Sequence, residues 1–117
     1  MGQVHALIGL MSGTSLDGVD GVLGLIDQRG HWLGSVAHAH EPFDDALKAE
    51  LLALNTPGPD ELHRAALAGQ EVSRLYARVV ERLRPQLPAH TPLLALGAHG
   101  QTVRHRPELG YLSLIHI

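Results

Sequence analysis

The sequence predicts an α/β fold in which three strands are followed by two helices and a fourth strand, in the order β-β-β-α-α-β. Three observations support this order. Short apolar runs alternate with turn residues up to about residue 40, an apolar spacing typical of helices follows between residues 43 and 84, and a short apolar run occupies residues 93–96. Because the last strand is reached through helices, it can lie parallel to an earlier one.

The composition limits the class of protein. At 117 residues the chain forms one domain at most, and 44% hydrophobic residues are enough for it to fold. A net charge of −3 argues against a nucleic-acid surface, and the lack of cysteine excludes disulfides and thiolate metal sites. No signal peptide and no membrane-spanning run of about 20 apolar residues is found, so we expect a soluble cytoplasmic protein with neither nucleic-acid nor membrane partners.

The first three strands are expected to form an antiparallel meander. Residues 4–10 are almost continuously apolar, which favours a strand covered on both faces. Residues 19–26 form the second strand, and residues 27–30 form a turn in which Gly30 can take the left-handed conformation. Residues 31–40 form the third strand, and the short connections make neighbouring strands antiparallel.

Two helices follow the meander. Residues 43–54 place Phe43, Leu47, Leu51 and Leu54 on one face, and prolines after residue 56 end this helix. The second helix runs to about residue 84, and we expect Asp60 to cap its amino end. Its apolar stripe is predicted at Leu62, Ala66, Gly69, Val72, Tyr76, Val79 or Val80, and Leu83.

The turn between the first two strands carries the strongest chemical signal, in the sequence GLMSGTSLDGVD at residues 9–20. Gly13 and Gly18 allow positive φ and close approach to a ligand. The hydroxyls of Thr14 and Ser15 can donate to phosphate oxygens, and Asp17 and Asp20 can hold Mg²⁺ directly or through water. The alternative is an ordinary hairpin turn, which uses the same residue types. No Walker lysine follows.

A second polar stretch, residues 97–107, follows the last strand. His99, Gln101 and Thr102 supply neutral donors and acceptors suited to a sugar, at the carboxyl end of a strand where ligands bind in open α/β sheets. Arg104, His105 and Arg106 could bind an anionic group. The alternative is a turn with satisfied backbone contacts followed by a solvated loop.

Histidine is frequent in this chain, and two of the nine are candidates for metal ligands. His38 and His40 share one face of the third strand. No third ligand stands at a recognised spacing, so we expect no histidine metal site.

Residues 9–20 and 97–107 together resemble two motifs of the anhydro-N-acetylmuramic acid kinases. The resemblance implies an incomplete ribonuclease-H-like lobe of the actin-like, sugar-kinase and Hsp70 superfamily. It places the phosphates of ATP at the first motif and the sugar at the second. The implied ATP-phosphate residues are Gly13, Thr14, Ser15, Leu16, Asp17, Gly18, Val19 and Asp20, and the implied substrate residues are His99, Gln101 and Thr102.

The resemblance also implies an activity. Enzymes of this family use ATP and Mg²⁺ in the cytoplasm to open 1,6-anhydro-N-acetylmuramic acid with water and phosphorylate it to N-acetylmuramic acid 6-phosphate in cell-wall recycling, and they commonly form homodimers. Their general base lies beyond the second motif, so we assign no catalytic residue in this chain and expect it to be inactive alone. Residues 1–111 correspond to a partial amino-terminal kinase lobe, whereas residues 112–117 depart from the family pattern and are expected to be a non-native tail.

Two other interpretations remain. The chain could be a stand-alone, non-catalytic module that binds a phosphate or a sugar. Another superfamily member, such as an acetate kinase or an Hsp70-like ATPase, is disfavoured because those groups do not pair the two motifs in this way.

Overall fold

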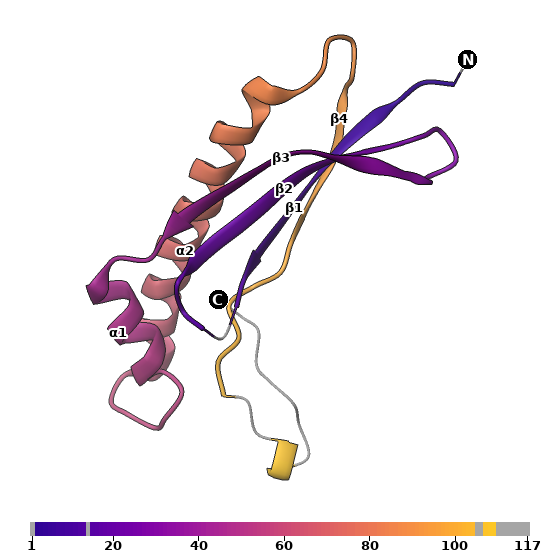
Figure 1. Ribbon diagram of the computed structural model, residues 1–117. Coiled ribbons are helices and arrows are strands. Elements are labelled where there is room, and N and C mark those ends of the chain that lie inside the picture. The colour runs from indigo at the N-terminus through magenta and orange to yellow at the C-terminus, as the bar shows by residue number, and fades with distance from the viewer. Residues whose placement is uncertain (1, 14, 105–106, 110–117) are drawn as a thin grey trace.

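The computed structural model describes residues 2–13, 15–104 and 107–109, so the expected tail at residues 112–117 lies outside the described part (Figure 1). The elements follow the predicted order, which confirms the α/β class. Two short 3₁₀ turns, Arg84–Gln86 and Pro107–Leu109, accompany them. The strands and helices are β1 (His5–Ser12), β2 (Gly18–Ile26), β3 (Trp32–Pro42), α1 (Asp45–Ala53), α2 (Glu61–Leu83) and β4 (Leu93–Ala98).

The four strands form one sheet in the order β3-β2-β1-β4. The pairs β1–β2 and β2–β3 are antiparallel, as the short turns predicted, and β4 lies parallel to β1 after the helical crossover. The first strand of the chain is therefore an inner strand of the sheet. Because β1 and β4 run in the same direction, the polar segments that follow them emerge at the same edge.

Both helices lie on one side of the sheet, and α2 passes behind β2 and β3 in Figure 1. The core forms between them, with Ala6, Ile8 and Leu10 of β1 facing the helices. The helix comes so close to β2 that a side chain at Gly21 would overlap Val79. This close approach explains why glycine stands in the middle of a strand.

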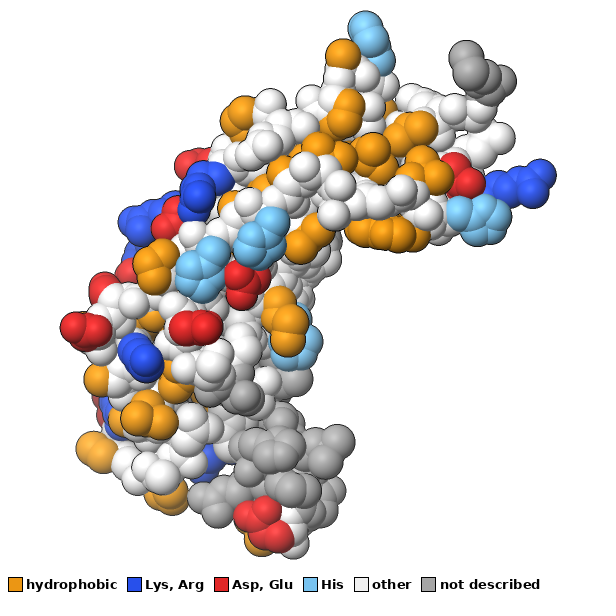
Figure 2. Space-filling view, in the orientation of Figure 1, with side chains coloured by type: hydrophobic (Ala, Val, Ile, Leu, Met, Phe, Trp, Pro, Cys, Tyr) orange, Lys and Arg blue, Asp and Glu red, His pale blue; other side chains and the backbone are white. Residues whose placement is uncertain are grey.

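The opposite face of the sheet is open within the described part of the chain. The expectation that both faces of β1 are covered is wrong here, because Gly9 is exposed and Met11 is 56% exposed. Figure 2 shows hydrophobic side chains gathered over the upper part of the sheet. A continuous apolar run is therefore a poor guide to two-sided burial when both helices pack on the same side.

The buried stripe of α2 differs from the predicted one at its amino end. The buried residues are Ala68, Val72, Leu75, Val79 and Leu83. Leu62 is instead 89% exposed, and Ala66 is exposed too. The first turns of α2 lie beside α1 rather than on the sheet, so the sheet does not select their apolar face.

The two helices begin differently. Asp44 caps α1 as its side chain accepts from the Leu47 N–H (2.7 Å). The expected side-chain cap at Asp60 is wrong, because this residue is left-handed (φ 55°) and makes no capping hydrogen bond. The Glu61 side chain instead accepts a hydrogen bond from the Gly58 N–H (3.1 Å). This is a side-chain contact to the backbone at the amino end of α2.

An ion pair joins the two helices. Arg64 of α2 contacts Glu50 of α1 and also donates to the Pro59 carbonyl (3.0 Å). The hydrogen bond from Arg64 holds the pKa of Glu50 below its usual value. The pair therefore fixes the connection between α1 and α2, against which the second polar motif also packs.

Candidate functional site

The first motif is a tight turn that joins β1 to β2. The Gly13 carbonyl accepts from the Leu16 N–H (3.3 Å), and the Ser15 hydroxyl donates to Asp17 Oδ1 (3.1 Å). The Asp17 carbonyl accepts from the Phe43 N–H (3.2 Å), which ties the turn to the end of β3. Thr14 lies outside the described residues. The turn is therefore anchored through Asp17, while the side chains of Ser15 and Asp17 remain exposed.

The backbone of the turn is unusual at Leu16 and Gly18. Leu16 is left-handed (φ 57°), with its side chain buried in the core. Gly18 has φ 155°, and a side chain there would meet the His40 ring and overlap the Glu41 carbonyl. Among the described residues of the turn, only Leu16 and Gly18 have a positive φ. We expected a positive φ at both Gly13 and Gly18, and the structure shows it at Gly18 but not at Gly13.

Two of the predicted phosphate-site residues turn their side chains into the core. Leu16 is 5% exposed, and Val19 is fully buried beneath the helices. The Leu16 N–H already donates to Gly13. Any contact of either side chain with a ligand is therefore indirect, and both residues act first as packing anchors for the turn.

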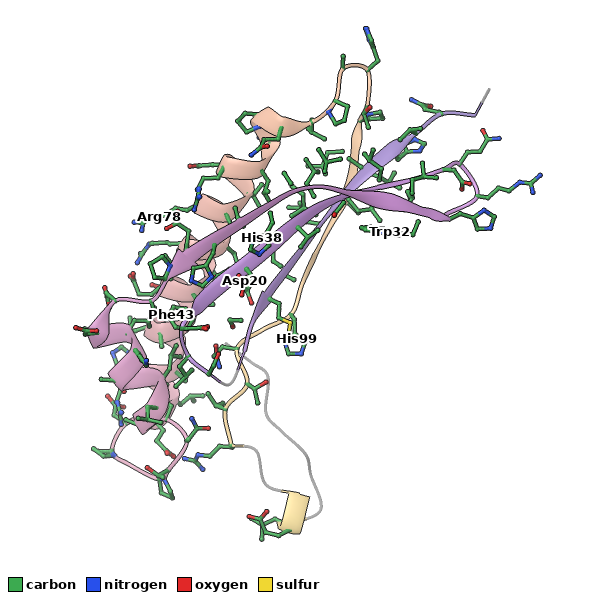
Figure 3. All side chains as sticks on the ribbon, in the orientation of Figure 1. Asp20, Trp32, His38, Phe43, Arg78 and His99 are labelled. Atoms are coloured by element: carbon green, nitrogen blue, oxygen red, sulfur yellow. The ribbon has the colours of Figure 1, made fainter. Side chains whose placement is uncertain are left out.

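Asp20 lies on the open face of the sheet between two histidines of β3 (Figure 3). Its Oδ1 is 2.9 Å from His40 Nδ1 and 3.4 Å from His38 Nε2. Two register shifts between β2 and β3 bring His40 opposite Asp20 and leave His38 opposite Val22. This contact was not predicted, because the alternation of β3 indicates only that both histidines share a face.

The second motif continues directly from β4. The His99 N–H donates to the Leu10 carbonyl (2.9 Å), and the Tyr76 hydroxyl donates to the His99 carbonyl. The His99 side chain is exposed, and Figure 3 shows it beyond the end of β4. The backbone is held from two sides while the imidazole stays free of the core, an arrangement that suits a ligand contact.

Gln101 connects the two motifs. Its side chain is fully buried, and Nε2 donates to the carbonyls of Gly13 (3.3 Å) and Thr102 (3.1 Å). Gln101 Oε1 and the buried Ser12 hydroxyl have no hydrogen-bond partner within the described residues. Thr102 is half-buried. The fold thus brings the two motifs together, whereas the predicted ligand roles of His99, Gln101 and Thr102 stay predictions.

Arg104 is engaged within the fold. Its N–H donates to Asn55 Oδ1 (2.9 Å), its Nε donates to the Leu54 carbonyl (2.9 Å), and its guanidinium pairs with Glu61. These contacts fasten the second motif to the connection between the helices. The guanidinium is therefore not free for the anionic group suggested above, and His105 and Arg106 lie outside the described residues.

Asp17 of the turn and Asp20 of β2 are the carboxylates of the first motif that could contact a magnesium ion. The described residues contain no group of three or more histidine, aspartate or glutamate side chains able to hold a metal ion. Mg²⁺ needs fewer, because it is commonly bound by one or two carboxylates together with phosphates and water. Asp17 is exposed and Asp20 is half-buried, so both can be reached.

A separate hollow of about 440 Å³ lies on the open face of the sheet. Its lining includes Leu7, Gly9, Val22, Gly24 and Trp32 and contains no charged side chain. A phosphate or sugar needs hydrogen-bonding partners, so this hollow does not suit either one. No helix in the described part of the chain has the length and apolar character needed to cross a membrane.

Comparison with known proteins decides the family. The family model described as anhydro-N-acetylmuramic acid kinase matches residues 5–115, which include both motifs and every strand and helix. This chain belongs to the anhydro-N-acetylmuramic acid kinase family. The two motifs that Gln101 joins are therefore two parts of one kinase sequence.

Relatives named anhydro-N-acetylmuramic acid kinase match over most of the chain. The Bordetella avium protein is 60% identical over 107 residues, covering 92% of this chain and 28% of the relative. The Neisseria meningitidis serogroup C (strain 053442) protein is 54% identical over 110 residues, covering 93% of this chain and 30% of the relative. The Variovorax paradoxus protein is 61% identical over 104 residues, covering 86% of this chain and 26% of the relative. The chain thus spans less than a third of the length of these relatives.

Proposed function

We propose that the complete enzyme corresponding to this chain phosphorylates 1,6-anhydro-N-acetylmuramic acid with ATP and Mg²⁺, opening the anhydro ring with water to give N-acetylmuramic acid 6-phosphate. The family match over residues 5–115 carries this proposal. The hydrogen bond between Gln101 and Gly13 supports it, because it places the two motifs at one edge of the sheet.

Within this proposal the turn from Gly13 to Asp20 contacts the phosphates of ATP. Asp17 and Asp20 would repel phosphate unless a cation lies between them, so their acidic character is consistent with bound Mg²⁺. That ion would offset the charge of the phosphates during transfer. His99 and Thr102 face the sugar from the neighbouring strand end.

The general base that activates water is proposed to come from a part of the enzyme that this chain does not include. Phosphoryl transfer depends mainly on positioning and on charge stabilisation, which need the groups around the transferred phosphate to be present together. We therefore propose that this chain alone binds but does not turn over its substrates. For the whole enzyme we propose a cytoplasmic location, where ATP is supplied, and a homodimer.

Titration calorimetry of the chain with Mg²⁺ and ATP tests the nucleotide site. We expect binding that Asp17→Asn weakens roughly 10- to 150-fold, since hydrogen bonds and contacts of charged groups contribute about 1.5–3 kcal/mol. The exposed Asp45→Asn variant of α1 makes the same charge change away from the turn and should bind normally. Binding of the anhydro-sugar without any binding of ATP would instead favour a non-catalytic sugar module.

A further inference from the structure

We propose that Gln101 is a positioning residue that sets the conformation of the ATP-phosphate turn, rather than a ligand of the sugar. The inference deepens the proposed function and rests on it. Gln101 is fully buried, so its side chain has no exposed atom with which to meet a substrate. Its side-chain NH₂ group instead donates a hydrogen bond to the Gly13 carbonyl of the first motif.

The orientation of the Gln101 amide follows from its neighbours. The two nearest polar groups on one side are the carbonyls of Gly13 (3.3 Å) and Thr102 (3.1 Å), and both are acceptors only. The NH₂ group must therefore face them, and Oε1 must face the other way. One amide thus binds both motifs, across 88 positions of sequence.

The Gly13 carbonyl is the group that this contact controls. It accepts from Gln101 and also from the Leu16 N–H, which closes the turn. A carbonyl oxygen that turned toward a bound phosphate would repel it, because both carry negative charge. By holding this oxygen toward the protein interior, Gln101 keeps the mouth of the turn suitable for an anion.

The unpaired atoms nearby argue against a purely stabilising role. Gln101 Oε1 and the Ser12 hydroxyl are buried without a partner in the described part of the chain. Buried polar atoms of this kind weaken a fold, and an apolar side chain at position 101 would avoid the cost of one of them. A glutamine here is therefore explained by the contact it makes with the turn.

The Gln101→Glu variant tests the role because it changes one NH₂ group to an oxygen at constant shape. Protonated glutamate can donate to the Gly13 carbonyl, whereas ionised glutamate repels it. We expect the amide resonances of Leu16 and Gly18 to change with pH in the variant in a way that the parent, which carries the same Asp17 and His40 beside them, does not show. We also expect ATP affinity relative to the parent to fall about tenfold as the glutamate ionises, the size expected for losing a buried hydrogen bond.

Two further variants complete the test. Gln70→Glu makes the same chemical change at an exposed position of α2 and should leave the turn resonances and ATP affinity unchanged at every pH. Gln101→Met keeps an unbranched side chain without a donor, and should shift the turn resonances equally at every pH. It provides the measurement if the glutamate variant does not fold.

The outcomes separate the two proposals. If the parent does not bind ATP, the proposed nucleotide site fails, while the resonances of Leu16 and Gly18 still decide the role of Gln101. Resonances in Gln101→Glu or Gln101→Met that match the parent at all pH values would overturn the positioning role. Unfolding of both variants would also overturn it, because Gln101 would then be a core residue needed for stability.

Discussion

Leu16 offers a direct test of how the turn is held. It combines a left-handed backbone (φ 57°) with a side chain that is 5% exposed. The left-handed conformation costs a non-glycine residue about 1–2 kcal/mol. Burying a leucine side chain contributes about 1.5–3 kcal/mol, which is enough to hold the residue in this conformation. The two effects can be separated by substituting alanine and glycine at the same position.

Both substitutions remove the buried side chain, and we expect Leu16→Ala to lower the free energy of unfolding by about 2–5 kcal/mol. Glycine also removes the left-handed strain, a gain of about 1–2 kcal/mol, but it costs about 0.5–1 kcal/mol of backbone entropy. Leu16→Gly should therefore equal Leu16→Ala in stability or exceed it by up to about 1.5 kcal/mol.

Leu51 is the matched control, because it is fully buried but lies in the regular helix α1. Glycine at Leu51 should be about 1 kcal/mol less stable than alanine. Urea unfolding followed by circular dichroism measures all four variants. The reasoning is refuted if glycine is worse than alanine at position 16 by as much as it is at position 51.

Three other predictions follow from local contacts. Gly18→Ala should cost about 1–3 kcal/mol in urea unfolding because its β-carbon would overlap the Glu41 carbonyl, whereas Gly9→Ala, with open space around it, should be nearly neutral; equal effects would contradict this. Gly24→Ala should push aside Trp32, the single tryptophan, and change its fluorescence emission; an unchanged spectrum would show that the ring does not rest on Gly24. The backbone N–H of His31, helped by that of Arg29, lowers the pKa of Asp27, so an NMR titration should place its midpoint below that of an ordinary aspartate. Because the folded pKa is the lower one, the stability from Asp27 is complete above the unfolded pKa and is lost as pH falls through the folded value; a normal midpoint would remove this pH dependence.

Much of the fold was predictable because the local signals agree. Apolar runs and turn residues placed all four strands, and the apolar stripe through Leu47 and Leu51 placed α1, whereas the capping role of Asp44 was not predicted. The same signals do not specify which side of the sheet a helix covers. One-sided burial of β1 and the exposure of Leu62 were therefore missed, since both depend on where α1 and α2 pack.

The candidate site was predictable in its location but not in its contacts. The glycines, hydroxyls and carboxylates of residues 13–20 marked the turn, and the order of elements brought His99 to the same edge of the sheet. The contact of Asp20 with His40 depends on two register shifts, which no residue spacing encodes. The burial of Gln101 and its hydrogen bond to Gly13 likewise depend on long-range packing, which the residue types of the second motif do not encode.

The position of β4 in the sheet has a consequence for the order of folding. The strands β1, β2 and β3 are joined by short turns and can pair early, since hairpins form in about 1–10 µs. β4 can pair with β1 only by closing a much longer loop that contains both helices, and closing such a long loop is slower. The contact of Gln101 with Gly13 must wait for that last step. A chain emerging from the ribosome would thus carry the turn between β1 and β2 well before Gln101 could make its contact with that turn.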